Sequence, residues 1–123
     1  MARILVAEDD PKNREILGDN LEDWGYQVTS TRDGAEALER ANHGDFDLIL
    51  SDWMMPRMTG IKLCESLKQN ENTRHIPVVI LSTKDSKEDI AQAYDVGAHD
   101  YISKPSKKDD LQNRLAKALT SNA

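Results

Sequence analysis

Four short apolar runs in this chain each end at a polar residue of a different chemical kind. The runs occupy residues 4–7, 48–51, 78–81 and 101–103, and the polar residues that follow them are Glu8, Asp52, Ser82 and Lys104. Open α/β sheets bind ligands at the carboxyl ends of their parallel strands. If the four runs are neighbouring strands, the fold brings carboxylates, a hydroxyl and an amine to one edge of a sheet.

Apolar runs alternate with helical patterns five times, which is typical of repeated βα units around a parallel sheet. Gln27–Thr31 mixes apolar with polar residues, as an edge strand does, whereas the runs at 48–51 and 78–81 are apolar on both faces and therefore central. The sequence predicts an α/β fold with a doubly wound five-stranded parallel sheet. The expected strands are Arg3–Ala7, Gln27–Thr31, Leu48–Ser51, Val78–Leu81 and Tyr101–Ser103.

A helix is expected after each strand. The first should span about Lys12–Trp24 and end at Gly25, because glycine commonly ends helices. Residues 120–123 are expected to form a frayed tail. Side chains that can cap the starts of the other four helices are Asp33, Thr59, Ser86 and Ser106.

Composition excludes several classes of protein. At 123 residues, with 38% hydrophobic and 31% charged residues, the chain fits one globular domain over residues 1–123. A net charge of −6 argues against direct nucleic-acid binding. No apolar stretch approaches the ~20 residues of a membrane span and the start lacks a secretory signal, so we expect no membrane insertion. The single cysteine, Cys64, excludes an internal disulfide and fits a cytoplasmic location.

The acidic strand ends predict a metal site. Glu8, Asp9 and Asp52 would lie at adjacent strand ends, where their charges repel one another. A hard divalent cation relieves that repulsion, and Mg²⁺ is commonly held by one or two carboxylates together with water and phosphate oxygens. For Asp10, beside Pro11, a solvated turn that caps the first helix is the better interpretation.

Asp52 can act as a nucleophile, because a carboxylate can attack phosphorus and form an aspartyl phosphate. Taken singly, each strand-end residue has a simpler explanation. Asp52 could cap a turn, Lys104 could extend its amine into solvent, and Ser82 or Thr83 could cap the following turn. Their order and positions together favour a site for phosphoryl transfer.

The motifs at these strand ends resemble those of the receiver domains of bacterial response regulators, of the single-domain type similar to chemotaxis regulators. They are EDDP, DWMMPRMTG around Asp52, LST, and YISKP. The resemblance covers essentially the whole chain. It implies a flavodoxin-like (βα)5 fold with strand order 2-1-3-4-5. It also implies a signalling protein of a two-component phosphorelay, which catalyses only its own phosphorylation and slow dephosphorylation.

The resemblance implies that Asp52 is the phosphoacceptor. It would take a phosphoryl group from a phosphohistidine on a sensor histidine kinase or a histidine phosphotransfer protein. Mg²⁺, or Mn²⁺ in its place, would be held by Glu8, Asp9, Asp52 and the backbone carbonyl of Met54. Asp9 would be a direct ligand, and Glu8 would act through water.

The same resemblance implies which residues change their contacts on phosphorylation. Ser82 would supply a hydroxyl and Lys104 a cation to the phosphoryl oxygens, while the rotamer of Tyr101 would report phosphorylation. The bond before Pro105 would be cis. Phosphorylation would change the surface of the fourth helix, fifth strand and fifth helix, to which an unidentified protein target binds.

Some positions differ from the commonest choices in receivers. Glu8 stands where aspartate is frequent, and Thr83 is larger than the usual alanine or glycine, which narrows access to the site. Met54, Thr83 and Lys84 are expected to tune the lifetime of the aspartyl phosphate. Neither Met54 nor Lys84 orients water well, so a long-lived phosphorylated state is expected. Trp53 is expected to form a partly exposed lid beside the acceptor.

The sequence argues against three alternatives, the last of them, a pseudo-receiver, because the acceptor, acids, hydroxyl and lysine are all present. A phosphatase similar to the haloacid dehalogenases would need a second aspartate where Met54 stands, and a flavodoxin-like cofactor binder would need a phosphate loop where the acidic triplet from Glu8 stands. A pseudo-receiver would keep the fold and lose the chemistry. The chain could be freestanding or part of a larger protein, and a monomer or a phosphorylation-dependent dimer.

Overall fold

The computed structural model describes residues 1–121, in which five strands alternate with five helices as predicted. The strands are β1 (Arg3–Ala7), β2 (Gln27–Thr31), β3 (Leu48–Ser51), β4 (Val78–Ser82) and β5 (Asp100–Ser103). The helices are α1 (Pro11–Asp23), α2 (Gly34–His43), α3 (Gly60–Lys68), α4 (Lys87–Asp95) and α5 (Lys108–Ser121). No helix in this part of the chain is long and apolar enough to cross a membrane.

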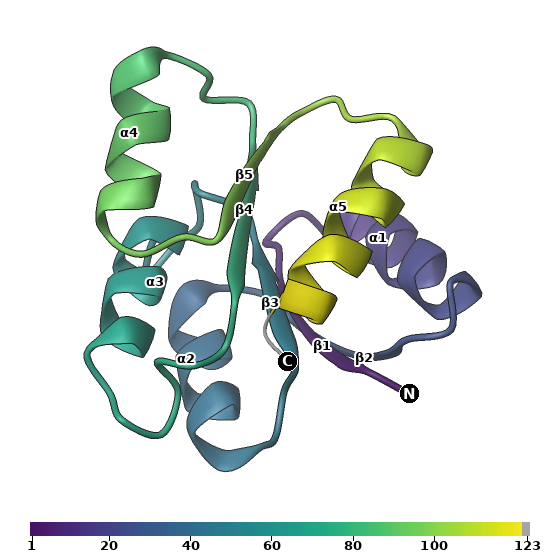
Figure 1. Cartoon of the computed structure of the whole chain (residues 1–123), viewed down its shortest axis with the longest axis horizontal. Helices are drawn as coiled ribbons and strands as arrows, with labels where there is room; N and C mark the ends of the chain where they lie inside the picture. Colours follow the sequence, from purple (N-terminus) through teal and green to yellow (C-terminus); the bar gives the residue numbers. More distant parts are fainter. Residues whose placement is uncertain (122–123) are drawn as a thin grey trace.

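The strands form one parallel sheet in the order β2-β1-β3-β4-β5, which confirms the expected topology. Helices α1 and α5 cover one face of the sheet, and α2, α3 and α4 cover the other (Figure 1). β2 lies at an edge and keeps an exposed residue at its start, whereas every residue of β3 and β4 is buried. The edge and central positions follow the patterns of the sequence.

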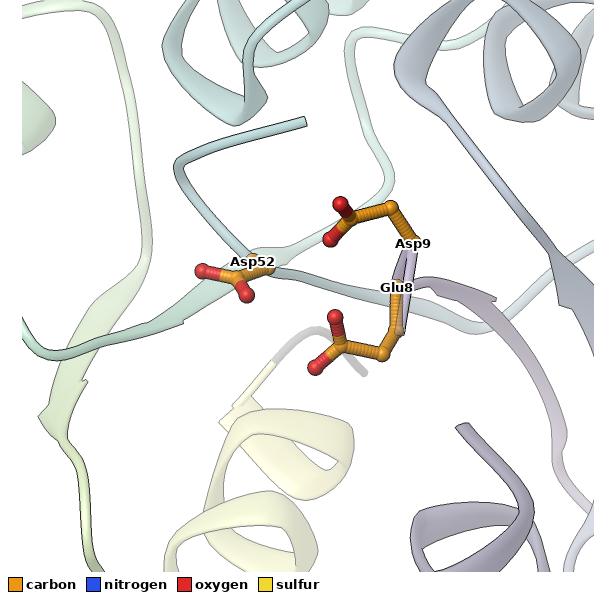
Figure 2. Close-up of side chains that lie close together, drawn as sticks. All are labelled: Glu8, Asp9 and Asp52. Atoms are coloured by element: carbon orange, nitrogen blue, oxygen red, sulfur yellow. The ribbon is translucent and has the colours of Figure 1, made fainter. Parts of the chain in front are cut away.

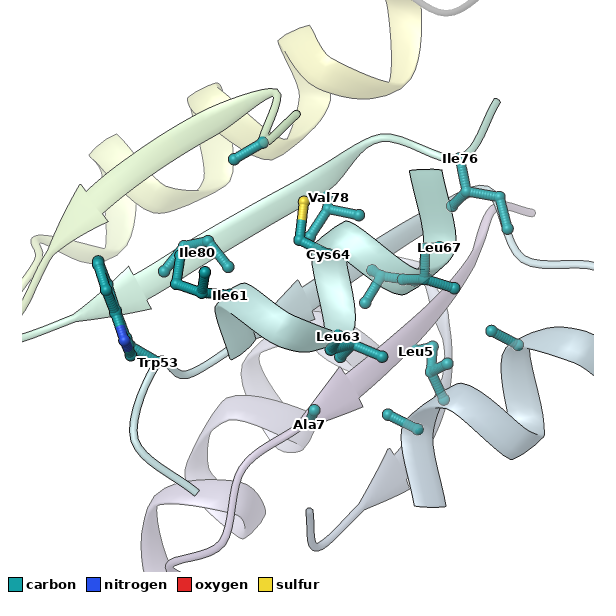
Figure 3. Close-up of a cluster of buried hydrophobic side chains, with 14 of the residues drawn as sticks. Leu5, Ala7, Trp53, Ile61, Leu63, Cys64, Leu67, Ile76, Val78 and Ile80 are labelled. Atoms are coloured by element: carbon teal, nitrogen blue, oxygen red, sulfur yellow. The ribbon is translucent and has the colours of Figure 1, made fainter. Parts of the chain in front are cut away.

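Successive side chains of a strand point to opposite faces, so the sheet divides the core into two apolar clusters. In β1, Leu5 and Ala7 pack with residues of α2, α3 and α4, while Ile4 and Val6 pack with residues of α1 and α5. Figure 3 shows the first cluster, in which one face of α3 lies against the sheet. Burial on both faces explains why the central runs contain almost no polar residue.

Three of the predicted helix caps are confirmed. The side chains of Asp33, Thr59 and Ser86 each accept a hydrogen bond from the backbone N–H three residues further along the chain. Asp10 caps α1 in the same way, as expected. A cap of this kind contributes about 1 kcal/mol. The caps fix where α1 to α4 begin, and so where the loops that carry the strand-end residues stop.

Two predictions about the last helix are wrong. Ser106 does not cap α5, because the helix begins at Lys108 and its Leu111 N–H donates to the Lys107 carbonyl. Residues 104–107 form the connection that leads away from β5. The predicted tail from residue 120 is also too long, since α5 continues through Ser121. Burial of Ala118 against the sheet supports that last turn, and residues 122–123 lie outside the described residues.

Cys64 is fully buried on α3, and its Sγ donates to the Val96 carbonyl at 3.7 Å. Burial raises the pKa of the thiol to about 11, although Lys68 opposes the shift. The reactive thiolate is therefore scarce at neutral pH. These properties support the interpretation of Cys64 as a small apolar residue of the core.

We expect the native protein to be inert to an aromatic disulfide reagent at pH 8, because the Cys64 thiol is buried and protonated. The chain has one cysteine, so the released chromophore reports this thiol alone. In urea the same protein should release one equivalent. Rapid reaction of the folded protein, with its circular dichroism spectrum unchanged, would contradict the buried placement.

Candidate functional site

The pairing of β1 with β3 places two acidic strand ends beside each other. Ala7 pairs with Ser51, so Glu8 and Asp52 follow neighbouring strands at the same level. Oxygen atoms of Glu8, Asp9 and Asp52 lie within 4.8 Å of one another. Figure 2 shows the three side chains converging from these two segments. The structure thus brings together the three acids that the sequence predicts to be neighbours.

Lys104 joins this cluster from the end of β5. Its Nζ lies 3.0 Å from Glu8 Oε1 and 3.0 Å from Asp52 Oδ2, so one amine bridges two of the carboxylates. Burial lowers the pKa of Lys104, but the hydrogen bonds to Asp52 and Glu8 outweigh it and raise the pKa. The lysine is therefore fully charged at neutral pH.

Glu8 is the most enclosed acid of the cluster, with 3% of its surface exposed. Burial raises the pKa of its carboxyl, while Lys104 and the backbone N–H of Asp10 oppose the shift. One carboxylate oxygen accepts from Lys104 and the other from Asp10 N–H. Asp9 is exposed, and within residues 1–121 no hydrogen bond reaches its carboxylate. Asp9 is thus the acid whose oxygens are free to bind a cation.

Asp52 is held from several sides. Its N–H donates to the Ala7 carbonyl at 2.9 Å, and its Oδ1 accepts from the Trp53 N–H at 2.7 Å. A Cβ on Gly60 would collide with the Asp52 carbonyl, so only glycine lets the start of α3 pack this closely. Gly60, which ends the motif DWMMPRMTG, therefore has a packing role.

The loop between Asp52 and α3 is tied to α2. Arg57 adopts a left-handed backbone conformation with φ of 67°, and its guanidinium pairs with Asp33 at 2.9 Å. A backbone hydrogen bond lowers the pKa of the Asp33 carboxyl despite some burial, and Arg57 lowers it further. These contacts hold the loop that presents Met54, whose side chain is 59% exposed.

Ser82 is buried at the end of β4, and its Oγ accepts from the Lys84 N–H at 3.2 Å. The hydroxyl of Tyr101 is buried without a hydrogen-bond partner in the described chain. Burial raises the pKa of Tyr101, while the nearby Ser82 hydroxyl lowers it by a smaller amount. Two of the residues expected to form the switch thus adjoin, and Tyr101 faces inward.

Trp53 connects Tyr101 to the acceptor loop. Its ring meets Tyr101 edge to face with centroids 6.3 Å apart, and Lys84 Nζ lies 5.1 Å above the indole. The prediction of a partly exposed Trp53 lid is wrong, because only 6% of the residue is exposed. Both Lys84 and Tyr101 contact the ring. These contacts depend on tertiary packing and have no local sequence signal.

The remaining predicted residues lie around the rim. The Lys104–Pro105 peptide bond is cis, as predicted. Thr83 is exposed beside an open cavity of about 460 Å³ between α1 and α5, which Glu8, Lys104 and Pro105 also line. None of the three histidines belongs to the acidic cluster in residues 1–121. Arg14 of α1, which the sequence did not mark as a site residue, donates to the carbonyls of Glu8 and Asp9.

The donor set fits Mg²⁺. Three carboxylates offer hard oxygen atoms within 4.8 Å of one another, which is the ligand chemistry that Mg²⁺ prefers. The set contains neither thiolate nor imidazole, the ligands typical of zinc sites. Beside the carboxylates stands a fixed cation, so the site can hold an anionic group as well as a metal.

The site and the fold agree with comparisons to known proteins. A family model, the response regulator receiver domain, matches residues 4–116. The chain therefore belongs to the receiver domain family of two-component signalling proteins. Receiver domains are signalling modules that pair with histidine kinases and bind Mg²⁺ at an acidic pocket, and Glu8, Asp9 and Asp52 form a candidate for that pocket.

Relatives include regulators of two lengths. The phosphate regulon transcriptional regulatory protein PhoB of Escherichia coli is 40% identical over 113 residues, which cover 92% of this chain and 49% of PhoB. The chemotaxis protein CheY-3 of Vibrio cholerae is 34% identical over 116 residues, covering 94% and 89% of the two chains. The chain spans about half the length of the first curated relatives that it matches.

Solved receiver structures are also similar. The receiver domain of Francisella response regulator 1452 is 38% identical, with a TM-score of 0.91 and 100% of both chains covered. The receiver domain of sensor histidine kinase PA1611 from Pseudomonas aeruginosa is 30% identical, with a TM-score of 0.90 and coverage of 97% and 98%. That structure has a magnesium ion coordinated in its active site cleft.

Replacing Lys104 with methionine should lower the free energy of unfolding by about 2 kcal/mol in the presence of EDTA. The variant leaves Glu8 buried and unpaired beside Asp52, because the amine that bridges them is gone. Urea unfolding followed by circular dichroism measures the change.

A double variant provides the control for Lys104→Met. Adding Glu8→Gln should recover most of the loss, since the buried charge is removed together with its partner. Lys107→Met, at an exposed lysine, should change the free energy by less than about 0.5 kcal/mol. Equal stabilities of Lys104→Met and wild type would show that the bridge does not hold the cluster together.

Proposed function

We propose that this chain is the phosphoacceptor of a two-component phosphorelay and that Asp52 carries the phosphoryl group. The observation that carries this proposal is the convergence of three carboxylates and Lys104 at the ends of β1, β3 and β5. Membership of the receiver family supports it. The phosphodonor would be a phosphohistidine on a sensor histidine kinase or on a histidine phosphotransfer protein.

In the proposed step, an Asp52 carboxylate oxygen attacks the phosphorus atom in line with the bond to the histidine nitrogen. The new O–P bond forms as the N–P bond breaks, and the electron pair returns to the imidazole, which takes up a proton. Such a transfer needs little covalent help from the protein, and depends on positioning and on cations near the phosphoryl oxygens. The Trp53 N–H and Lys104 fix the carboxylate for attack.

Glu8, Asp9 and Asp52, with the Met54 carbonyl, would hold Mg²⁺, and Mn²⁺ could replace it. The metal would neutralise charge on the phosphoryl oxygens. Asp9 would bind directly because its carboxylate has no other partner among the described residues. Both Glu8 oxygens already accept hydrogen bonds, which supports contact through water.

The charge of the aspartyl phosphate would drive the conformational change. An aspartyl phosphate carries roughly two negative charges at neutral pH in place of the single charge of the Asp52 carboxylate, and Lys104 and the Ser82 hydroxyl would compensate the added charge. A shift of Ser82 toward the phosphoryl group would alter the packing of Tyr101 and Trp53. Through them the change would reach α4, β5 and α5, the proposed surface for a protein target. A nearly complete shift in population requires about 5 kcal/mol of differential stabilisation.

The open cavity between α1 and α5 supports a protein phosphodonor. It has a volume of about 460 Å³, reaches Glu8 and Lys104, and is bordered by Ile16, which is 51% exposed. We propose the opening beside Glu8 and Lys104 as the contact surface for this partner. The phosphodonor would approach along this side.

Three rim residues would set the lifetime of the phosphorylated state. Met54 is exposed, Thr83 lies at the cavity, and the amine of Lys84 is placed over Trp53 and 3.9 Å from Asp89. None of the three is an acid or amide that would orient a water for attack. We propose slow self-dephosphorylation and no turnover of small substrates.

Incubation with Mg²⁺ and acetyl phosphate should add one phosphoryl group to the wild-type chain, seen as a single mass increase in intact mass spectrometry. Asp52→Asn should gain none, because an amide is a poor nucleophile. Asp10→Asn serves as the matched control, since Asp10 caps α1 and lies outside the metal-competent cluster. Modification that persists in Asp52→Asn would refute the assignment of the acceptor.

The Ser82→Ala variant should still accept a phosphoryl group at Asp52. The effect of phosphorylation on α4 and β5 should be weaker in this variant. Hydrogen exchange in α4 and β5 should change on phosphorylation of the wild type and change several-fold less in the variant, since the proposed coupling uses the Ser82 hydroxyl. Ser103→Ala, at the exposed partner position in β5, is the control. If Ser82→Ala and wild type show equal changes in exchange, the coupling through Ser82 does not exist.

A further inference from the structure

Arg14, in the first turn of α1, reaches back to the acidic turn that follows β1. Its Nη1 donates to the Glu8 carbonyl at 3.0 Å and to the Asp9 carbonyl at 3.4 Å. The chemistry proposed for the site gives this residue no part. Its sequence position also gives no hint of the contact, because the contact depends on how α1 folds back over the turn.

The two carbonyls belong to the peptide groups on either side of the Asp9 Cα. Each peptide group is planar, so fixing the direction of both carbonyls restrains the φ and ψ angles of Asp9. Those angles set the direction in which the Asp9 side chain leaves the backbone. A single guanidinium thereby orients a carboxylate that it does not touch.

Asp9 depends on this contact more than its neighbours do. The Glu8 carboxylate accepts hydrogen bonds from Lys104 and from the Asp10 N–H. The Asp52 carboxylate accepts hydrogen bonds from Lys104 and from the Trp53 N–H. Within residues 1–121 no hydrogen bond reaches the Asp9 carboxylate. Its place in the cluster of three acids therefore comes from the backbone.

We propose that Arg14 is a positioning residue that holds Asp9 in the geometry needed to bind a divalent cation. The proposal rests on the function proposed above, since it assumes that the three acids bind Mg²⁺. Arg14 acts through the two carbonyls and does not contact the metal or the phosphoryl group.

Charge and positioning predict opposite results for the loss of Arg14. A guanidinium near three carboxylates weakens the attraction for Mg²⁺, so removing its charge alone would tighten binding. If Arg14 orients Asp9, removing it weakens binding, because partners that orient a ligand commonly contribute 10- to 100-fold in metal affinity. The sign of the change separates the two effects.

The experiment is a Mg²⁺ titration of the full chain followed by Trp53 fluorescence, in a Trp24→Phe background so that one indole emits. Arg14→Gln should weaken Mg²⁺ binding about tenfold, and Arg14→Lys should recover part of the loss. Lys12→Gln is the matched control, an exposed cation in the same helical turn, and its affinity should be unchanged or slightly tighter.

Equal or tighter Mg²⁺ binding by Arg14→Gln would overturn the proposal. Circular dichroism verifies folding, and if Arg14→Gln does not fold, Arg14→Lys is judged by the same criterion: weaker binding supports the proposal and equal binding overturns it. Asp9→Asn separates this proposal from the function. If wild type and Asp9→Asn titrate alike, the metal site itself fails, and the role of Arg14 with it. If only Arg14→Gln matches wild type, the metal site stands and Arg14 has no part in it.

Discussion

Electrostatic repulsion among three carboxylates is the constraint around which the C-terminal edge of this sheet is organised. Glu8, Asp9 and Asp52 have oxygen atoms within 4.8 Å of one another, and Glu8 is almost fully buried. Like charges so close destabilise the folded state unless a cation lies between them. Lys104 supplies that cation by bridging Glu8 and Asp52, which lie 96 and 52 residues away from it in the sequence. The parallel sheet is what makes such a distant pairing possible.

The excess of carboxylates over cations also explains how the site can respond to a bound cation or to an added phosphoryl group. One fixed amine cannot satisfy three carboxylates, so a further cation is favoured there, and an added phosphoryl group would redistribute the contacts of Lys104. Trp53, whose N–H donates to Asp52, packs its ring against Tyr101, and the Tyr101 hydroxyl has no geometrically defined hydrogen-bond partner in the described chain. A buried unpaired hydroxyl costs free energy.

Several contacts to the backbone support the segments that carry the acids. Gly60 lets α3 begin against the Asp52 carbonyl, Arg57 ties the acceptor loop to Asp33, and Arg14 grips the turn that carries Asp9. These residues fix the directions from which the carboxylates approach one another. In this chain the frame around the acids thus includes Arg14 of α1, the Asp33–Arg57 pair and the first residue of α3.

Local patterns of apolar and polar residues were enough to predict the order of the elements, the edge position of β2, four helix caps and the identity of the strand-end acids. The motifs at the strand ends also resemble those of the receiver family. The burial of Trp53, the position of Lys84 over its ring and the start of α5 at Lys108 were visible only in the folded chain. Each of these depends on contacts between segments distant in the chain or on the path of a connection, which a local pattern of residues does not encode.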